Sequence, residues 1–178
     1  MKKSVLQEIL SVSVYLLVVL LLTLGVVTFV GERTWVNGES METTLYDGDN
    51  LIVNKFVYRF GEPKRFDIVV FPFKYTKNTY YIKRVIGLPG ETVRIDAHGI
   101  IYINDEILSE SYGREVIKDP GDALEGITLG EHEYFVLGDN RNESADSRDP
   151  SVGIVTKDQI IGKAWFRIYP FSKMGGVH

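Results

Sequence analysis

The stretch that decides the fold is Thr79-Tyr80-Tyr81-Ile82-Lys83-Arg84-Val85-Ile86. It is rich in aromatic and β-branched residues, and it ends at Gly87-Leu88-Pro89-Gly90, a cluster of turn formers. That pattern is typical of a β-strand bounded by a turn. Similar short runs recur on both sides of it, which predicts a domain built mainly from β-strands.

The other expected strands share short length and a β-branched or aromatic composition; they are 49–58, 66–71, 92–96, 100–103, 134–137 and 161–168. Residues 92–96 and 100–103 flank Ala97-His98-Gly99, which predicts a hairpin. Strands at this spacing indicate an antiparallel, mainly β domain of sandwich or barrel-like form. The polar segment 109–130 is expected to be an exposed loop, and the tail 174–178 to be disordered.

Residues 9–30 form an uncharged apolar run of about 22 residues. As a helix it would be ~33 Å long, enough to cross a ~30 Å hydrocarbon core. A buried core helix is the first alternative, but apolar residues lie on every face of this run, which favours lipid. A cleaved secretory signal is the second, but its apolar region is usually about 7–15 residues long. We therefore expect a retained transmembrane anchor.

The charges around this run predict its orientation. Lys2 and Lys3 precede it, which favours a cytoplasmic N-terminus, although Arg33 on the other side weakens the bias. The expected organisation is a cytoplasmic N-terminus at 1–8, an anchor at 9–30 and an extracytoplasmic domain at 31–178. The protein is thus predicted to lie in the cell membrane as a single-pass protein.

Composition excludes several classes of function. The chain has 20 Lys and Arg against 24 Asp and Glu, with no basic stretch suited to nucleic acid. It has no cysteine, so thiolate chemistry and disulfides are excluded. Its three histidines are scattered, and a zinc site has little support. No cofactor is implied, and nothing indicates an oligomeric state.

Lys83 lies among apolar and aromatic neighbours, which leaves two interpretations open. It could be a lysine on the solvent face, with Arg84 on the other side. Alternatively, burial could lower its pKa so that the amine accepts a proton near neutral pH. Such a lysine can replace the histidine of a Ser-His pair. The candidate serine is Ser40, in the polar turn of Val36-Asn37-Gly38-Glu39-Ser40-Met41-Glu42-Thr43-Thr44-Leu45.

A second polar stretch, 138–148, follows an expected strand and is dense in turn formers. It could be a plain surface loop; a calcium loop is disfavoured because the EF-hand spacing is not met. Alternatively it supports the lysine: Ser144 would bond and orient the amine, and Asp146 and Arg148 would pair behind it. Such support holds a catalytic group in its productive rotamer.

Together these stretches resemble the bacterial type I signal peptidase family. Residues 38–45 look like its nucleophile box, 81–91 like its lysine box, 138–148 like its last box and 66–71 like its intermediate strand. The resemblance implies a membrane-bound serine endopeptidase that uses no metal or cofactor. It implies Ser40 as nucleophile, Lys83 as general base and Ser144 as the residue that orients Lys83. Asp146 and Arg148 would shape the site.

The resemblance also implies an oxyanion hole that uses the Ser40 backbone N–H. Many members have a serine two positions earlier as a second donor, but here that position is Gly38, as in many Gram-positive members. A backbone donor or a water must then serve instead. Thr43 is the other departure, because the family usually has proline there. Its absence should loosen the turn after Ser40 without removing a reacting group.

The anchor and the expected chemistry imply secretory preproteins as substrates. Ser40 lies about ten residues beyond Val30, so it is at most ~33–36 Å from the bilayer surface. A secretory signal ends at the same surface, followed by a small-x-small cleavage site. An extended peptide can pair with an exposed strand edge. Met41, Ile82 and Tyr81 are candidate pocket walls, with ordinary core packing as the alternative.

Two other functions remain possible. A catalytically silent, membrane-anchored peptide-binding homologue would not need Ser40 and Lys83, both of which are retained. A Ser-Lys self-cleaving repressor of the phage type would need a DNA-binding N-terminal domain, where this chain has its apolar run. Signal peptide cleavage therefore explains the most features.

Overall fold

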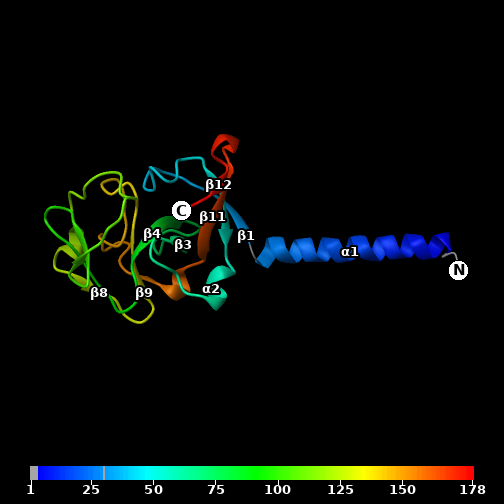
Figure 1. Ribbon diagram of the computed structural model, residues 1–178, viewed down its shortest axis with the longest axis horizontal. Helices are drawn as coiled ribbons and strands as arrows, with labels where there is room; N and C mark the ends of the chain where they lie inside the picture. Colours follow the sequence, from blue (N-terminus) through cyan, green and yellow to red (C-terminus); the bar gives the residue numbers. More distant parts are fainter. Residues whose placement is uncertain (1–3, 30) are drawn as a thin grey trace.

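The computed structural model of the protein describes residues 4–29 and 31–178. A long helix, α1 (Val5–Phe29), projects from a part built of short β-strands (Figure 1). The strand pairings among the described residues are all antiparallel. The predicted fold class, a mainly β chain with one N-terminal apolar helix, is confirmed.

The larger sheet carries the candidate site. In spatial order its strands are β1 (Gly31–Trp35), β2 (Asn50–Asn54), β11 (Gly162–Tyr169), β3 (Ile68–Pro72), β4 (Tyr80–Gly87), β9 (Glu133–Leu137) and β10 (Val155–Thr156), and β12 (Gly175–Gly176) pairs with β11. The alternation of the sequence sets the faces: in β2, Leu51 and Val53 are buried and their neighbours are not. Strand β3 is buried along nearly its whole length because it lies inside the sheet.

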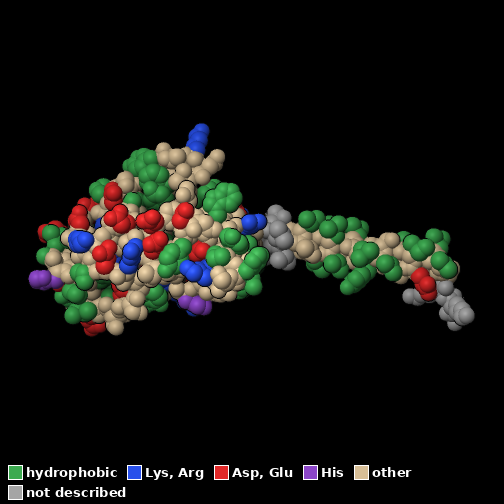
Figure 2. Space-filling model, turned by 90° about the horizontal axis from the view of Figure 1, so that it is seen from above, with side chains coloured by type: hydrophobic (Ala, Val, Ile, Leu, Met, Phe, Trp, Pro, Cys, Tyr) green, Lys and Arg blue, Asp and Glu red, His purple; other side chains and the backbone are tan. Residues whose placement is uncertain are grey.

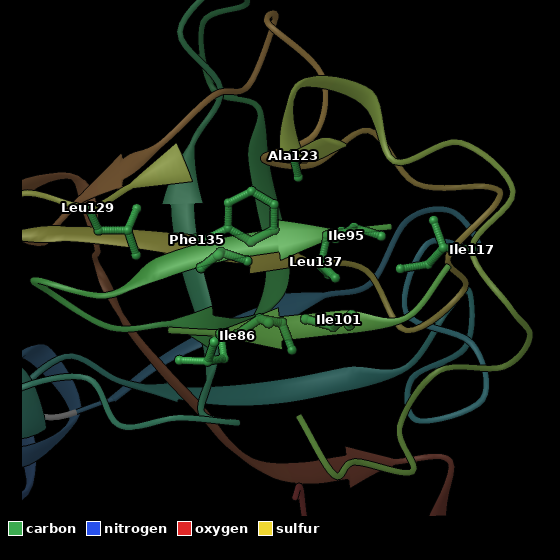
Figure 3. Close-up of a cluster of buried hydrophobic side chains, with 10 residues drawn as sticks. Ile86, Ile95, Ile101, Ile117, Ala123, Leu129, Phe135 and Leu137 are labelled. Atoms are coloured by element: carbon green, nitrogen blue, oxygen red, sulfur yellow. The ribbon is translucent and has the colours of Figure 1, made fainter. Parts of the chain in front are cut away.

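The smaller sheet has the order β7 (Glu106–Ile107), β6 (Ile101–Ile103), β5 (Thr92–Ile95) and β8 (Ile127–Thr128). The predicted hairpin is present, with Val93 opposite Ile103 across β5 and β6. Side chains of this sheet and of β4 and β9 share one hydrophobic cluster (Figure 3). Gly87 allows this close approach, since a Cβ there would lie 2.4 Å from Val93 Cγ2.

Helix α1 is long and apolar enough to cross a membrane from Val5 to Gly25, and that window is not buried within the protein. Hydrophobic side chains cover it, while the charged groups gather on the globular part (Figure 2). It fits a single-pass membrane anchor and is not a core helix of the β-rich part. The helix begins before the expected position 9, and Lys2, Lys3 and Val30 lie outside the described residues.

One expected strand is shorter than predicted. The strand over 49–58 ends at Asn54, and the one-turn helix α2 (Val57–Phe60) follows it. Asn54 Oδ1 accepts hydrogen bonds from the backbone N–H groups of Phe56, at 2.9 Å, and Val57, at 3.1 Å. An asparagine side chain that satisfies these donors draws the backbone out of the sheet ladder.

Two segments expected to be exposed or disordered are ordered and partly buried. Most of 109–130 is an exposed loop as expected, but Ile117, Ala123 and Leu129 are buried in the cluster between the sheets and hold it to the core. The disordered tail was predicted wrongly, because β12 pairs with β11 and Val177 is buried. In both cases single apolar residues among polar or glycine neighbours carry no periodicity, although each fills a place in the core.

Candidate active site

Ser40 and Lys83 meet although they come from different elements. Ser40 lies in the loop between β1 and β2, residues 36–49, which we call the Ser40 loop. Lys83 lies on β4, opposite Val69 of β3. Its Nζ donates a hydrogen bond of 2.7 Å to Ser40 Oγ. The lysine is 3% exposed, so this contact forms in a site from which water is largely excluded.

Burial changes the acid–base chemistry of Lys83. It lowers the pKa of the amine to about 8, and the nearby Arg148 guanidinium acts in the same direction. The carboxylates of Asp146 and Asp139 raise the pKa and offset part of this effect. An amine with such a pKa is neutral in a substantial fraction of molecules near neutral pH, so it can accept the proton of a serine hydroxyl.

Lys83 is buried, which excludes the alternative of a lysine on the solvent face, and Arg84 on the other side of the strand is fully buried as well. Its guanidinium binds Asp139 through two hydrogen bonds, of 2.8 and 2.7 Å. Thr44 Oγ1, in the Ser40 loop, donates to the same carboxylate at 2.5 Å. Alternation along β4 therefore places Lys83 beside Ser40 and places Arg84 beneath the loop that carries Ser40.

Asp139→Asn is expected to destabilise the protein by about 3–5 kcal/mol, because it leaves the Arg84 cation buried without its compensating charge. Urea unfolding in detergent measures the difference. Glu32→Gln is the matched control, because it breaks the ion pair with Lys55 at the surface, where the Lys55 side chain is 35% and the Glu32 side chain 57% exposed. This substitution should lower the free energy of unfolding by less than about 1 kcal/mol. Equal costs for the two variants would contradict the buried-pair assignment.

The 138–148 loop holds the backbone on both sides of the Ser40 side chain. The Asn140 N–H donates to the Ser40 carbonyl at 3.1 Å, and Asn140 Nδ2 donates to the Glu39 carbonyl at 3.2 Å. Gly138 packs so closely that a Cβ there would lie 2.4 Å from the Ser40 carbonyl oxygen. Only glycine permits this approach, so the loop and the Ser40 turn form one packed unit.

Asp146 and Arg148 stiffen that loop from within. They form a bidentate pair, with both nitrogen–oxygen distances 2.8 Å, and both side chains are buried. Asp146 Oδ2 also accepts the Gly138 N–H at 3.0 Å. This pair therefore fixes the glycine that contacts Ser40.

Ser144 does not form the hydrogen bond with Lys83 that the sequence predicted, and the backbone of Gly38 is bonded elsewhere. Ser144 Oγ is buried and forms no hydrogen bond with any described residue, Lys83 included. It packs against Gly138, where a Cβ would lie 2.2 Å from it. The Gly38 N–H donates to Asp47 Oδ1 at 2.9 Å, so it is not free to serve as a second oxyanion donor.

A groove of about 290 Å³ runs past Ser40 and Lys83, between β1 with its following residues and the first half of β4. Within the described chain, β1 pairs only with β2, so its other edge is open. Strand β9 pairs with β4 only from Arg84 onward, so the edge of β4 before Arg84 is open as well. Two strand edges therefore border the groove. The predicted wall residues Met41, Ile82 and Tyr81 line it, and Met41 is also packed in the core with 1% exposure.

Sequence reasoning missed four residues that build the site: Thr44, Arg84, Asp139 and Asn140. All four lie within the stretches 38–45, 81–91 and 138–148 that resemble the family's motifs, so the resemblance already marked their positions. Their roles depend on partners distant in the sequence, such as the 55 residues that separate Arg84 from Asp139. Among the described residues, no group of three or more His, Cys, Asp and Glu is arranged to hold a metal ion.

Comparison with known proteins shows which family the chain resembles. A family model described as signal peptidase, peptidase S26, matches residues 9–169. Signal peptidase I P from Bacillus subtilis subsp. natto is 41% identical over 166 residues, which cover 89% of this chain and 88% of that protein. Signal peptidase I from Leptolyngbya laminosa is 43% identical over 162 residues, covering 86% of this chain and 76% of that protein.

A solved structure of a signal peptidase I from Enterococcus faecalis is 37% identical, covers 58% of this chain and 97% of that chain, and has a TM-score of 0.48. The Bacillus relatives come from a Gram-positive lineage. The family model spans most of the chain, and the curated relatives are similar over most of their length. The chain therefore belongs to the S26 family of signal peptidases, enzymes that remove signal peptides from preproteins.

Proposed function

We propose that this protein cleaves preproteins by a Ser-Lys dyad, with Ser40 as nucleophile and Lys83 as general base. The observation that carries the proposal is the 2.7 Å contact between the Lys83 amine and Ser40 Oγ in a buried site. Neutral Lys83 takes the hydroxyl proton as Ser40 Oγ attacks the scissile carbonyl. The ammonium then returns the proton to the leaving amine, and water hydrolyses the acyl-enzyme by the same route.

The oxyanion of the tetrahedral intermediate needs hydrogen-bond donors that are already in position. The Ser40 N–H is the proposed donor, because it donates to no acceptor among the described residues. The hydrogen bond from Asn140 Nδ2 to the Glu39 carbonyl supports this role, since that carbonyl and the Ser40 N–H belong to the same peptide group. Asp146 and Arg148 act indirectly by holding Gly138, and Ser144, whose hydroxyl is free of other partners here, is the proposed residue for orienting Lys83.

The preprotein is proposed to bind as an extended strand in the groove between β1 and β4. Two strand edges supply backbone donors and acceptors, which is the arrangement that β-augmentation requires. Alternate side chains of such a peptide point into the walls formed by Met41, Ile82 and Tyr81. Met41 is packed in the core, so this wall cannot readily move to admit a large side chain, which supports cleavage after a small-x-small motif.

The proposed location follows from the anchor. Helix α1 lies in the membrane with its N-terminus in the cytoplasm and residues 31–178 on the extracytoplasmic side. Strand β1 starts within two residues of the end of α1 and leads to Ser40, so the groove stays near the bilayer surface. A signal peptide whose apolar region lies in the same bilayer presents its cleavage site at that height. Tethering raises the effective concentration of both partners.

The pH dependence of cleavage tests the role of Lys83. The pKa of about 8 means that the active, neutral amine increases as pH rises through that value. Single-turnover cleavage of a preprotein is therefore expected to rise about tenfold per pH unit below the pKa and to level off above it. Rates measured in detergent from pH 6 to 9.5 give the profile. A rate independent of pH over this range would contradict Lys83 as the base.

A further inference from the structure

The segment 174–178, which we call the C-terminal strap, is held against the larger sheet. Gly175 and Gly176 pair with Arg167 and Phe166 of β11. The Val177 N–H then donates to the Trp165 carbonyl at 3.0 Å. The pairing carries the strap across the sheet to the Ser40 loop.

Val177 packs into the hydrophobic cluster of the Ser40 loop. The other members include Val36, Met41 and Leu45, all from that loop. Val177 is 4% exposed and Met41, which directly follows Ser40, is 1% exposed. The strap therefore contributes a buried side chain to the same hydrophobic cluster as the residue next to the nucleophile.

The strap also shares a hydrogen-bonding centre with the Ser40 loop. Arg84 Nη2 donates to the His178 carbonyl at 3.3 Å, to Asp139 at 2.7 Å and to Thr44 Oγ1 at 3.2 Å. Just before the strap, Lys173 Nζ lies 3.8 Å from the centre of the Tyr46 ring. Contacts of three kinds, apolar, hydrogen-bonded and cation–π, thus join this end of the chain to one loop.

These contacts matter because the Ser40 loop has no strand partner along 36–49. Asn140 and Gly138 hold its backbone at Ser40, while Val177 and Arg84 support its interior. A nucleophile must be aligned closely, and a displacement of about 1 Å can cost ~100-fold in rate. We infer that the C-terminal strap is a positioning element, in which Val177 supports Met41 and thereby sets the position of Ser40 for attack. The inference rests on the proposed role of Ser40.

Val177→Ala tests the inference in the full-length protein in detergent. It should lower kcat at least about tenfold with little change in KM, because the interaction lost acts on attack rather than on substrate binding. The pH profile should keep its shape, since Lys83 and its surroundings are unchanged. Val177→Ile retains a branched apolar side chain and should keep kcat within about threefold of wild type.

Val93→Ala is the matched control, because Val93 is also buried but belongs to the cluster between the two sheets. Its thermal stability should fall comparably while kcat stays within about twofold of wild type. Equal losses of kcat in Val177→Ala and Val93→Ala would overturn the inference, since stability alone would then explain them. Full activity of Ser40→Ala would instead refute the proposed dyad.

A surface variant keeps the test decisive if Val177→Ala does not fold. Lys173→Ala removes the cation above Tyr46 without creating a cavity, and kcat should fall about two- to threefold. Lys74→Ala removes the corresponding contact with Tyr75, 4.9 Å from the ring centre and outside the site, and should leave kcat unchanged. Identical kcat values for these two variants would count against the strap.

Discussion

Ser40→Ala is expected to abolish cleavage of a secretory preprotein, with kcat falling by about 10⁴- to 10⁶-fold. The substitution removes the only hydroxyl that accepts a hydrogen bond from Lys83 among the described residues. It leaves the Ser40 carbonyl, and therefore its hydrogen bond with Asn140, in place. The loop should keep its position, so the loss should appear in the chemical step with KM nearly unchanged.

Quantified cleavage in detergent measures this effect, and thermal unfolding of the same sample shows that the variant is folded. Ser109→Ala is a suitable control because Ser109 is exposed and does not line the groove; it should be fully active. A Ser40→Ala protein with wild-type kcat would eliminate Ser40 as nucleophile. A wild-type protein that binds the preprotein without cleaving it would support the silent-homologue alternative.

The sequence was sufficient to predict the fold class and the apolar helix because both depend on local pattern. Aromatic and β-branched residues at 79–86, followed by turn formers, predicted β4, and β-branched runs on either side of a short turn predicted the hairpin of the smaller sheet. The apolar run lacks an amphipathic stripe, which separated a membrane helix from a core helix. In each case neighbouring residues determine the structure.

The parts that could not be predicted depend on partners distant in the sequence. The ion pair of Arg84 could not be predicted from its own strand, because burying a guanidinium is favourable only with a compensating carboxylate, and Asp139 lies just beyond the end of β9. Val177 lies between a glycine pair and a histidine, so only the assembled Ser40 loop shows the space that it fills. Asn54 is the exception, because its side chain ends the strand through local hydrogen bonds, which strand propensity does not reveal.

The two basic residues on β4 show how one strand supports both stability and chemistry. Arg84 has its charge compensated by Asp139 and links two loops. Lys83, one position earlier, faces Ser40, and burial lowers the pKa of its amine to about 8. A cation held permanently by its partner can brace the site, whereas only an amine that loses its proton can act as a base. Exchanging these residues would therefore disable both functions.

Lys83→Met is expected to lower kcat by at least about 10³-fold, because methionine has a similar length but no basic nitrogen. Lys83→Arg should be similarly inactive, since a guanidinium stays protonated and cannot accept the serine proton. If Lys83→Arg retained wild-type kcat, the lysine would serve only as a positive charge and not as a base. Cleavage rates of the two variants at pH 9 make this comparison where neutral lysine predominates in the wild type.

Lys83→Met should also change how the free energy of unfolding depends on pH. The folded pKa of Lys83 is about 8, below the value of about 10.4 for an unfolded lysine. Between these values the unfolded chain binds more protons, so wild-type stability rises with pH by about 3 kcal/mol from this group. Below pH 8 both states are protonated and the full cost of burying the ammonium remains.

Urea unfolding of wild type and Lys83→Met at pH 7, 9 and 10.5 isolates this contribution, because other titrating groups affect both proteins equally. The variant should be more stable than wild type at pH 7, and the difference should shrink as pH rises to 10.5. A stability difference between the two proteins that stays constant across this range would mean that burial does not destabilise the charged form of the Lys83 amine. The lysine would then lack the lowered pKa on which its proposed role as base depends, whatever the cleavage assay had shown.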